Sequence, residues 1–230
     1  ENKNFFYKVF NKILKRIIYK KINHEFLSIV QKSHYEFILI LKGVEVDIST
    51  IKKIKELGNF IINWSPDHYF NNLNSSKNLK SSLPFYDLII SPRTHLFDFY
   101  KSKGVKNLLH IDWYLNTDLQ YPINDNEYSE YLYDISFIGN WSPKREKYIS
   151  FLSNFNINIW GGGWKKSSVK FKNRFKVNDS IFFPEMSKII NSSKINLNFL
   201  TNENYDTSNF RNYELLAAKG FQLTEYSDFL

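Results

Sequence analysis

Short runs of apolar residues alternate along this chain with segments whose apolar residues recur at helical spacing. In the first half we expect strands at 35–41, 59–64, 86–90 and 106–111, and helices at 47–57 and 94–102. Strand, helix and strand at this spacing require right-handed crossovers and therefore a parallel sheet. Residues 71–82 are polar and show no period, so we expect them to form a loop.

A second series of the same kind follows the polar segment 116–131, which contains Pro122. We expect strands at 134–138, 157–160, 195–200 and 221–224, a further short strand at 181–183, and helices at 144–154, 185–192 and 210–218. The chain is therefore predicted to be an α/β protein with two parallel-sheet domains, residues 1–125 and 126–230. The cleft between two such domains is the expected ligand site.

The composition excludes several classes of protein. Hydrophobic residues make up 43% of the 230 residues and aromatic residues 18%, which supplies a packed core and excludes intrinsic disorder. No apolar run reaches the ~18 residues that span a bilayer. The chain has no cysteine, which excludes disulfide scaffolds, thiolate metal sites and cysteine nucleophiles and fits a reducing cytoplasm.

The formal net charge of +8 suits anionic partners such as nucleic acid, phosphorylated metabolites or an anionic membrane surface. A compositional bias toward Lys, Asn, Ile, Phe and Tyr explains the same excess, so charge alone does not choose among these partners. The sequence has no aromatic–basic motif of the RNA-recognition type, and we expect no nucleic-acid partner.

Residues 1–31 have the pattern of a basic amphipathic helix. Apolar residues from Phe6 to Ile18 recur at spacings of three and four, and lysine and arginine fill the positions between them. Such a helix either packs on a sheet with its basic face in solvent or lies on a membrane surface. We favour packing, because a strand follows directly. The protein is therefore expected in the cytoplasm, with peripheral contact at the inner face of the membrane as the alternative.

A glycine-containing motif lies where the strand expected at 134–138 meets the next helix. It contains Gly139 and Asn140, and Arg145 adds positive charge in the first helical turn. A glycine lets the backbone approach a ligand closely, and a helix N-terminus attracts anions. The motif is therefore a phosphate-site candidate, and a plain turn with solvated cations is the alternative.

A second motif, WGGGW, follows the strand expected at 157–160 and consists of Gly161, Gly162 and Gly163. Three consecutive glycines are entropically costly, which favours a ligand or a neighbouring backbone pressed against the loop. The motif is neither G-x-G-x-x-G nor a Walker A loop. It therefore argues against a dinucleotide-binding fold and against a P-loop NTPase.

Residues 204–220 place Asp206, Arg211 and Glu214 in a loop and first helical turn after the strand expected at 195–200. Ligands of open α/β sheets gather at the carboxyl ends of the strands. Carboxylates there can accept hydrogen bonds from sugar hydroxyls, and Arg211 can pair with a phosphate. The alternative is an ordinary helix N-terminus, which favours acidic residues.

The second half of the chain contains, in order, the motifs SFIGNWSPKRE, WGGGW, SKINLNFL, NYDTSNFRNYELLAAKG and FQLTE. With these motifs it resembles the CgeB-like (spore-maturation type) family of GT-B glycosyltransferases, which is related to group 1 glycosyltransferases. The resemblance is close over 134–228, looser over about 35–120, and absent from 1–34. It implies two Rossmann-like domains facing across a cleft, with 1–125 on the acceptor side and 126–230 binding the nucleotide sugar. Because outer elements of a GT-B fold are missing at both ends, both domains are expected to be incomplete.

The resemblance also implies an activity. The family is expected to move a hexose from a nucleoside diphosphate sugar to a glycan or glycoconjugate, in polysaccharide biosynthesis, with retention of anomeric configuration and without a metal or other cofactor. It implies that Glu214 holds the donor ribose, Asp206 the transferred sugar, and Arg145 and Arg211 the diphosphate. Because the first acid is Asp rather than the longer Glu, the donor itself is not assigned.

The sequence WSPDH follows a strand of the first series, and either Asp67 or His68 in it is a candidate base for the acceptor hydroxyl. A surface histidine without a chemical role is the favoured alternative. A different function class also stays open, namely a GT-B-derived module that binds a nucleotide or glycan without turnover. Binding of a nucleotide sugar without transfer would distinguish this module from an enzyme.

Overall fold

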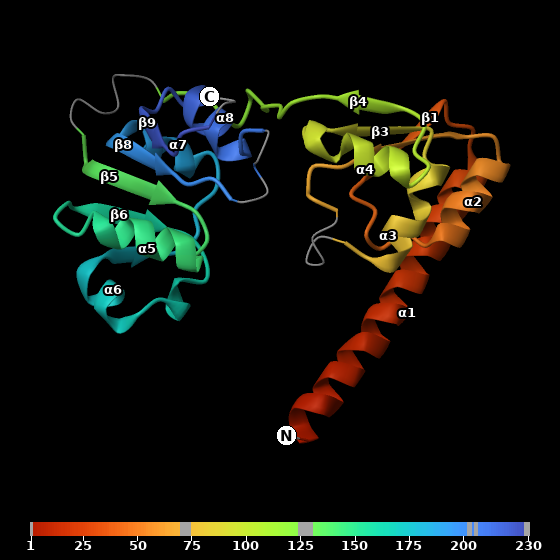
Figure 1. The fold of residues 1–230 in the computed structure, drawn as a ribbon, viewed down its shortest axis with the longest axis horizontal. Coiled ribbons are helices and arrows are strands. Elements are labelled where there is room, and N and C mark those ends of the chain that lie inside the picture. Colours follow the sequence, from red (N-terminus) through yellow and green to blue (C-terminus); the bar gives the residue numbers. More distant parts are fainter. Residues whose placement is uncertain (1, 70–74, 124–130, 202–203, 205–206, 228–230) are drawn as a thin grey trace. The chain divides into compact units, whose positions relative to one another are not determined.

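The computed structural model describes residues 2–69, 75–123, 131–201, 204 and 207–227, and Figure 1 shows the fold. The chain forms two compact units, Glu1–Asp112 and Trp113–Leu230, and each contains one parallel sheet. The predicted α/β class with two parallel sheets is therefore confirmed. The predicted domain boundary at residue 125 falls within 124–130, outside the described residues, and stays a prediction.

The sheet of the first unit has four parallel strands in the order β1-β2-β3-β4. The strands are β1 (Phe37–Leu41), β2 (Phe60–Trp64), β3 (Leu88–Ser91) and β4 (Leu108–His110). Each coincides with an apolar run of the first series. The register pairs Ile38 with Ile61, and both side chains are buried in the core of this unit.

Three helices and two 3-10 turns follow the strands of unit 1. They are α2 (Ile48–Glu56), α3 (Lys77–Ser82), η2 (Leu83–Phe85), η3 (Thr94–Leu96) and α4 (Phe97–Ser102). Helix α3 lies within 71–82, where the sequence predicts a loop, and this prediction is wrong for the helical residues. The Ser76 hydroxyl caps α3 by accepting a hydrogen bond from the Leu79 N–H at 3.0 Å, and Leu79 is fully buried. One buried leucine in a six-residue helix leaves no periodic pattern to detect.

The sheet of the second unit has five parallel strands in the order β7-β6-β5-β8-β9. They are β5 (Tyr133–Ile138), β6 (Ile157–Trp160), β7 (Lys176–Asn178), β8 (Ser193–Asn198) and β9 (Gln222–Thr224). The short strand predicted at 181–183 is wrong, because β7 occupies the edge of the sheet instead. Ile181 and Phe183 owe their apolar character to packing against a core cluster, and β7 has only one apolar residue to reveal it.

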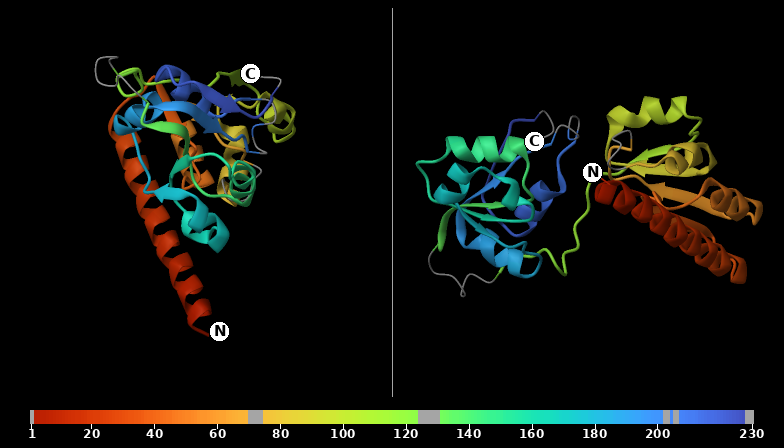
Figure 2. Two further views of the ribbon diagram at one scale, coloured as in Figure 1. Left: turned by 90° about the vertical axis from the view of Figure 1, so that its left-hand side faces the viewer. Right: turned by 90° about the horizontal axis from the view of Figure 1, so that it is seen from below.

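Helices cover both faces of this second sheet. They are α5 (Pro143–Phe151), α6 (Val169–Arg174), α7 (Glu185–Asn191) and α8 (Phe210–Ala217), with the 3-10 turn η5 (Trp164–Lys166). Phe137 joins a cluster with residues of α5 and α6, whereas its neighbour Ile138 joins one with residues of α7 and α8. Adjacent strand residues point to opposite faces, so the unit has three layers, as the right-hand view of Figure 2 shows.

Helix α1 (Asn2–Lys32) precedes the first sheet, as the sequence predicts. Its last turns pack on unit 1, where Val30 is buried and Phe26 and Leu27 contact the core. The Asn23 side chain fixes this end further, because its Nδ2 donates a hydrogen bond to the Glu45 carbonyl at 2.8 Å. Among the described residues, no helix combines the length and the apolar character needed to cross a bilayer.

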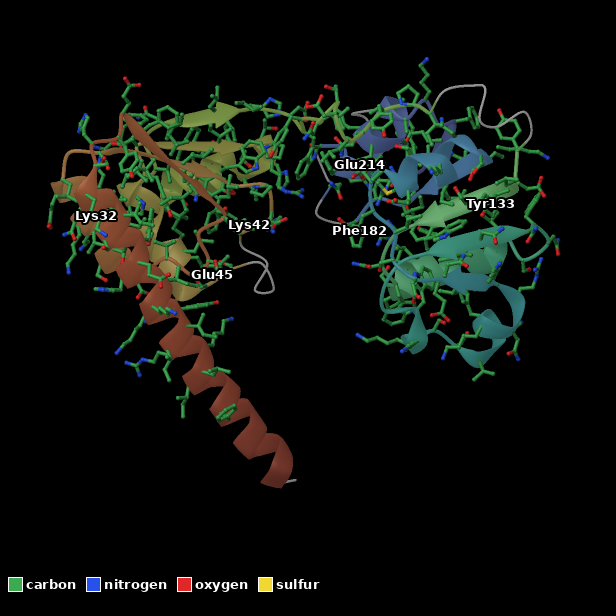
Figure 3. All side chains as sticks on the ribbon, turned by 180° about the vertical axis from the view of Figure 1, so that it is seen from behind. Lys32, Lys42, Glu45, Tyr133, Phe182 and Glu214 are labelled. Carbon is green, nitrogen blue, oxygen red and sulfur yellow. The ribbon has the colours of Figure 1, made fainter. Side chains whose placement is uncertain are left out.

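The described apolar side chains between residues 10 and 18 of α1 are exposed, so the prediction that residues 1–31 bury their apolar face is wrong for this stretch. Five of its large apolar side chains are 44–63% exposed, namely Phe10, Ile13, Leu14, Ile17 and Ile18. A 31-residue helix is about 46 Å long and the five-residue strand β1 about 17 Å, so the helix extends beyond its sheet. In Figures 1 and 3 the other elements of unit 1 gather at the C-terminal half of α1.

Candidate functional site

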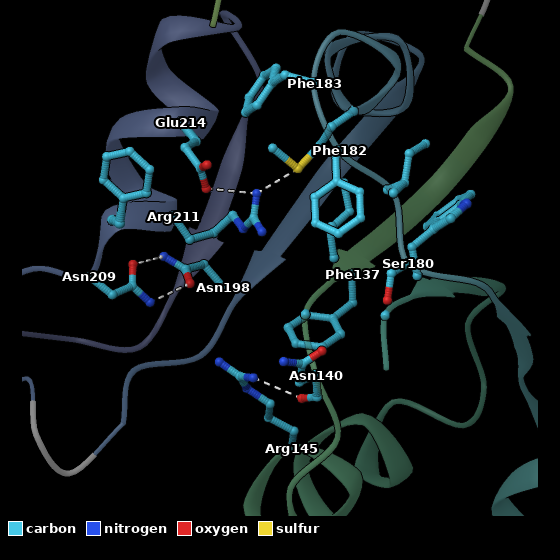
Figure 4. Close-up of a pocket in the computed structure, with 17 residues that line it drawn as sticks. Phe137, Asn140, Arg145, Ser180, Phe182, Phe183, Asn198, Asn209, Arg211 and Glu214 are labelled. Carbon is cyan, nitrogen blue, oxygen red and sulfur yellow. Dashed lines mark hydrogen bonds and ion pairs between the residues drawn. The ribbon is translucent and has the colours of Figure 1, made fainter. Parts of the chain in front are cut away.

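A pocket of about 540 Å³ lies in unit 2 at the carboxyl edge of its sheet (Figure 4). This is the edge at which open α/β sheets bind their ligands. Its lining comes from the loops after β5, β6, β7 and β8 and from the start of α8, and it includes Gly139, Asn140, Arg145, Gly161, Ser180, Phe182, Asn198, Asn209, Arg211 and Glu214. The structure therefore brings most of the predicted donor-binding residues to one cavity.

The loop between β5 and α5 supplies the first cation of the pocket. A Cβ atom on Gly139 would lie 2.9 Å from the ring of Phe137, so any larger residue here would require this ring to shift. Ser142 caps α5, and Arg145 in the first turn donates from Nη1 to the Asn140 carbonyl at 2.8 Å. Burial and the nearby Arg211 lower the pKa of Arg145. A guanidinium and the N-terminus of α5 therefore face the same space.

Gly161, the first residue of the glycine run, has to be glycine because the backbone of the neighbouring loop lies against it. Gly161 has φ +147°, and a Cβ atom there would lie 2.2 Å from the Gly139 carbonyl oxygen. Two hydrogen bonds fix this approach, from the Gly139 N–H to the Trp160 carbonyl at 2.8 Å and from the Trp141 N–H to the Gly162 carbonyl at 2.9 Å. Gly161 lines the pocket, whereas Gly162 and Gly163 line an adjacent hollow.

The start of α8 supplies a second cation and a carboxylate. Arg211 and Glu214 form an ion pair with Nη1 and Oε2 2.8 Å apart, and Arg211 also contacts the Met186 sulfur (Figure 4). Glu214 is 9% exposed, and its burial raises its pKa although Arg211 and Gln120 act in the opposite direction. Burial also lowers the pKa of Arg211. The pocket lining thus carries two arginines and one carboxylate, a net positive charge that suits an anion.

Side-chain amides that sequence analysis missed hold the first turn of α8 against β8. Asn209 caps the helix by accepting from the Asn212 N–H at 3.1 Å. Its Nδ2 donates to Asn198 Oδ1 at 2.8 Å, and Asn198 Nδ2 donates back to Asn209 Oδ1 at 3.0 Å. An asparagine that ends an otherwise apolar strand, as in INLNFL, is the signal that could have revealed Asn198.

The segment after β4 also supports this site, and its role was not foreseen. The indole N–H of Trp113 donates to the Ser208 carbonyl at 2.8 Å, and the Trp113 ring lies 5.8 Å from that of Phe210. Gln120 is buried, and its amide reaches Glu214 Oε1 at 3.4 Å. These contacts join residues more than 90 positions apart, so no local pattern predicts them.

Asp206 and His68 are two further residues that the sequence predicts for the site. Asp206 lies outside the described residues, so its position is not available to test its predicted role. His68 belongs to unit 1, at the carboxyl end of β2, and its ring lies 5.7 Å from that of His95. Its neighbour Asp67 pairs with Lys42 Nζ at 2.5 Å. Within the described part of the chain, no group of three or more His, Asp or Glu side chains is placed to hold a metal ion.

Residues 144–230 match the protein family described as glycosyl transferase-like. No curated protein is a significant match to the chain. Among solved structures, the sucrose-phosphate synthase of Thermosynechococcus elongatus aligns with a TM-score of 0.62 and 11% identity, over 90% of this chain and 60% of that one.

Two glucosyltransferases align in the same way. An alpha-glucosyltransferase in complex with UDP-glucose and abasic-site DNA gives a TM-score of 0.59 and 13% identity, over 87% of this chain and 62% of that one. The DNA-modifying enzyme beta-glucosyltransferase gives a TM-score of 0.51 and 15% identity, over 85% of this chain and 64% of that one. The chain therefore spans 60–64% of the length of these three structures. It has the GT-B glycosyltransferase fold, with a glycosyl transferase-like domain over residues 144–230.

Proposed function

We propose that this chain binds a nucleoside diphosphate sugar in the pocket of unit 2 and transfers the sugar to a glycan or glycoconjugate acceptor. The observation that supports this most is the convergence of Arg145, Arg211 and the N-termini of α5 and α8 on one cavity beside the buried carboxylate of Glu214. The UDP-glucose named in the alpha-glucosyltransferase structure is a ligand of this chemistry. We further propose that the enzyme is CgeB-like, that it transfers a hexose with retention of anomeric configuration, and that it needs no metal.

The diphosphate is assigned to the cationic side of the pocket. Arg145 and Arg211 can each donate charge-assisted hydrogen bonds to phosphate oxygens, and the positive ends of the α5 and α8 helix dipoles add to the attraction. Gly139 and Gly161 keep the adjacent backbone free of side chains, so that the diphosphate can approach it. This arrangement stabilises the negative charge that collects on the diphosphate when the bond to the sugar breaks.

The ribose is assigned to Glu214, which lies beside Arg211, and the base is assigned to the Phe182 ring. Glu214, when ionised, accepts hydrogen bonds from ribose hydroxyls, which can replace part of its interaction with Gln120. The Phe182 ring lines the same pocket and is 75% exposed, which leaves an aromatic face free to stack on the base. Asp206 is assigned to the transferred sugar on the resemblance alone, and His68 is assigned to the acceptor hydroxyl on its place after a strand of the first sheet.

The proposal is tested with Arg145→Ala, and with Lys147→Ala as a matched control on an exposed position of the same helix. Isothermal titration with UDP, UDP-glucose and uridine separates the diphosphate from the nucleoside. We expect Arg145→Ala to weaken the binding of UDP and of UDP-glucose by about 1.5–3 kcal/mol, which is the range for a hydrogen bond to a charged group. The binding of uridine should stay nearly unchanged. Equal losses for all three ligands would contradict the assignment of Arg145.

Turnover is tested separately by following release of UDP from UDP-glucose, with and without candidate acceptors. An enzyme releases UDP in a reaction that Arg145→Ala slows. Tight binding of the nucleotide sugar with neither transfer nor hydrolysis would favour the non-catalytic binding module instead.

A further inference from the structure

Helix α1 carries two apolar stripes on roughly opposite sides. The side chains that fix the helix to unit 1, Phe26, Leu27 and Val30, form one stripe. Phe10, Ile13, Leu14, Ile17 and Ile18 form the other, which we call the outer stripe. At 3.6 residues per turn, the two stripes are centred about 160° apart around the helix axis. Because the C-terminal half fixes the rotation of the helix, the outer stripe is turned into solvent.

The charges around the outer stripe are of one sign. Residues 2–24 include seven lysines and arginines and no aspartate or glutamate. Helical geometry places Lys20 beside one edge of the outer stripe and places Lys15 and Arg16 each about 60° beyond its two edges, and all three are exposed. The nearest acidic side chain along the helix is Glu25, which lies 3.8 Å from Lys21.

We propose that the outer stripe and its flanking cations are a docking surface for a lipid membrane that contains anionic headgroups. The helix would lie in the plane of the interface, with the outer stripe at the boundary between headgroups and acyl chains and with Lys15, Arg16 and Lys20 reaching the phosphates. Long lysine side chains suit this position, because their stems pack on apolar surface while the ammonium reaches the polar layer.

This partner is the one whose chemistry matches both features of the surface. A second copy of the chain would bury the apolar stripe but would bring two sets of like charges together. A nucleic acid would neutralise the cations but would leave five large apolar side chains in water. An anionic membrane satisfies the apolar and the cationic groups at once. The inference concerns unit 1 and does not depend on the proposed function of the pocket in unit 2.

Flotation of the 230-residue chain with phosphatidylcholine vesicles, with and without phosphatidylglycerol, tests the proposal. One variant removes the flanking charge (Lys15→Ser, Arg16→Ser, Lys20→Ser), another removes apolar area from the outer stripe (Ile13→Ser, Ile17→Ser), and a control removes three exposed lysines of unit 2 (Lys165→Ser, Lys166→Ser, Lys170→Ser). The substituted side chains are exposed, so unchanged far-ultraviolet circular dichroism and melting temperature are expected for every variant.

We expect the chain to float with the anionic vesicles, to float poorly with phosphatidylcholine alone, and to be released by high salt. The charge variant should partition on the order of 100-fold more weakly, from about 1 kcal/mol for each of three cations near the surface. The outer-stripe variant should partition onto the vesicles about 10-fold or more weakly than the parent. The unit 2 control should partition more strongly than either α1 variant and close to the parent. Failure of the parent to bind anionic vesicles would overturn the proposal. So would binding that survives both variants, or a concentration-dependent dimer that the outer-stripe variant abolishes while no vesicle is bound.

Discussion

Replacement of Arg211 by methionine is the most informative perturbation of the pocket. The Arg211–Glu214 pair is largely enclosed, since the two side chains are 23% and 11% exposed. Methionine keeps an unbranched side chain of similar length next to Met186 but removes the charge. The carboxylate of Glu214 then loses the cation of its ion pair while it stays buried, and the Gln120 amide is the one donor that remains to it among the described residues. We expect the variant to be less stable by about 3 kcal/mol at neutral to alkaline pH, the lower end of the range for an uncompensated buried charge.

The loss should depend on pH in a direction that the structure fixes. Burial raises the pKa of Glu214 even with Arg211 present, and removal of Arg211 raises it further. A carboxyl group whose pKa is raised on folding contributes stability that is fully present below its unfolded pKa of about 4.3 and is lost as the pH rises through its folded pKa. The difference between parent and variant should therefore be small in acid and should grow as the pH rises through the folded pKa of Glu214.

Urea unfolding followed by tryptophan fluorescence suits this measurement. Of the five tryptophans, Trp113, Trp141, Trp160 and Trp164 belong to unit 2, which contains the ion pair, and only Trp64 belongs to unit 1. The double variant Arg211→Met/Glu214→Gln should recover most of the loss at alkaline pH, because the buried charge is gone. Lys170→Met, on an exposed position of α6, controls for removal of a cation and should change little. A loss that is equal in acid and alkali, or that Glu214→Gln does not rescue, would refute this reasoning.

Three further predictions follow from the same geometry. Gly161→Ala should lower the free energy of unfolding by about 3 kcal/mol or more, because the new Cβ would meet a backbone carbonyl. Gly58→Ala is the control: its Cβ has open space, so the loss should be only about 1 kcal/mol, from the positive φ. Similar losses for the two variants would contradict this prediction. Trp113→Phe should cost about 1 kcal/mol by removing one buried hydrogen bond, measured by thermal unfolding, and no loss would mean that the indole contact is unimportant. Glu214→Gln should weaken UDP and UDP-glucose alike, while Asp206→Asn should leave UDP binding nearly unchanged and slow sugar transfer; identical effects of both on every ligand would contradict the division of roles.

Strands rich in apolar residues could be placed from the sequence, because residues that a core buries are apolar and form recognisable runs. Ile157–Trp160 was expected as a strand and is one, with all four residues buried. The failures share one physical cause, which is that burial and regular structure are separate properties. Helix α3 and strand β7 have one buried or apolar residue among polar ones, and so they are regular without a pattern. The run 181–183 is apolar because it packs on a cluster, and it is not regular.

The candidate site divides in a similar way. Arg145, Arg211 and Glu214 could be proposed from the sequence because charged residues at the ends of apolar strands are conspicuous, and the structure places all three in one pocket. Asn198 and Gln120 could not be proposed with the same ease, because a neutral amide carries no signal of its own. Their importance lies in partners that are distant in the sequence, and only the fold brings those partners within hydrogen-bond reach.

The glycines of the pocket show why a functional role read from such residues needs the neighbouring backbone as well. Gly161 is required because the loop after β6 touches the loop after β5, and the Gly139 and Trp141 N–H groups bond across that contact. The loop that carries Arg145 is therefore fixed by the sheet, while the amides of Asn198 and Asn209 fix the loop that carries Arg211. Cations held in place before a ligand arrives need little reorganisation to meet an anion. A backbone contact with a structural cause thus gives the pocket the rigidity that binding of a diphosphate requires.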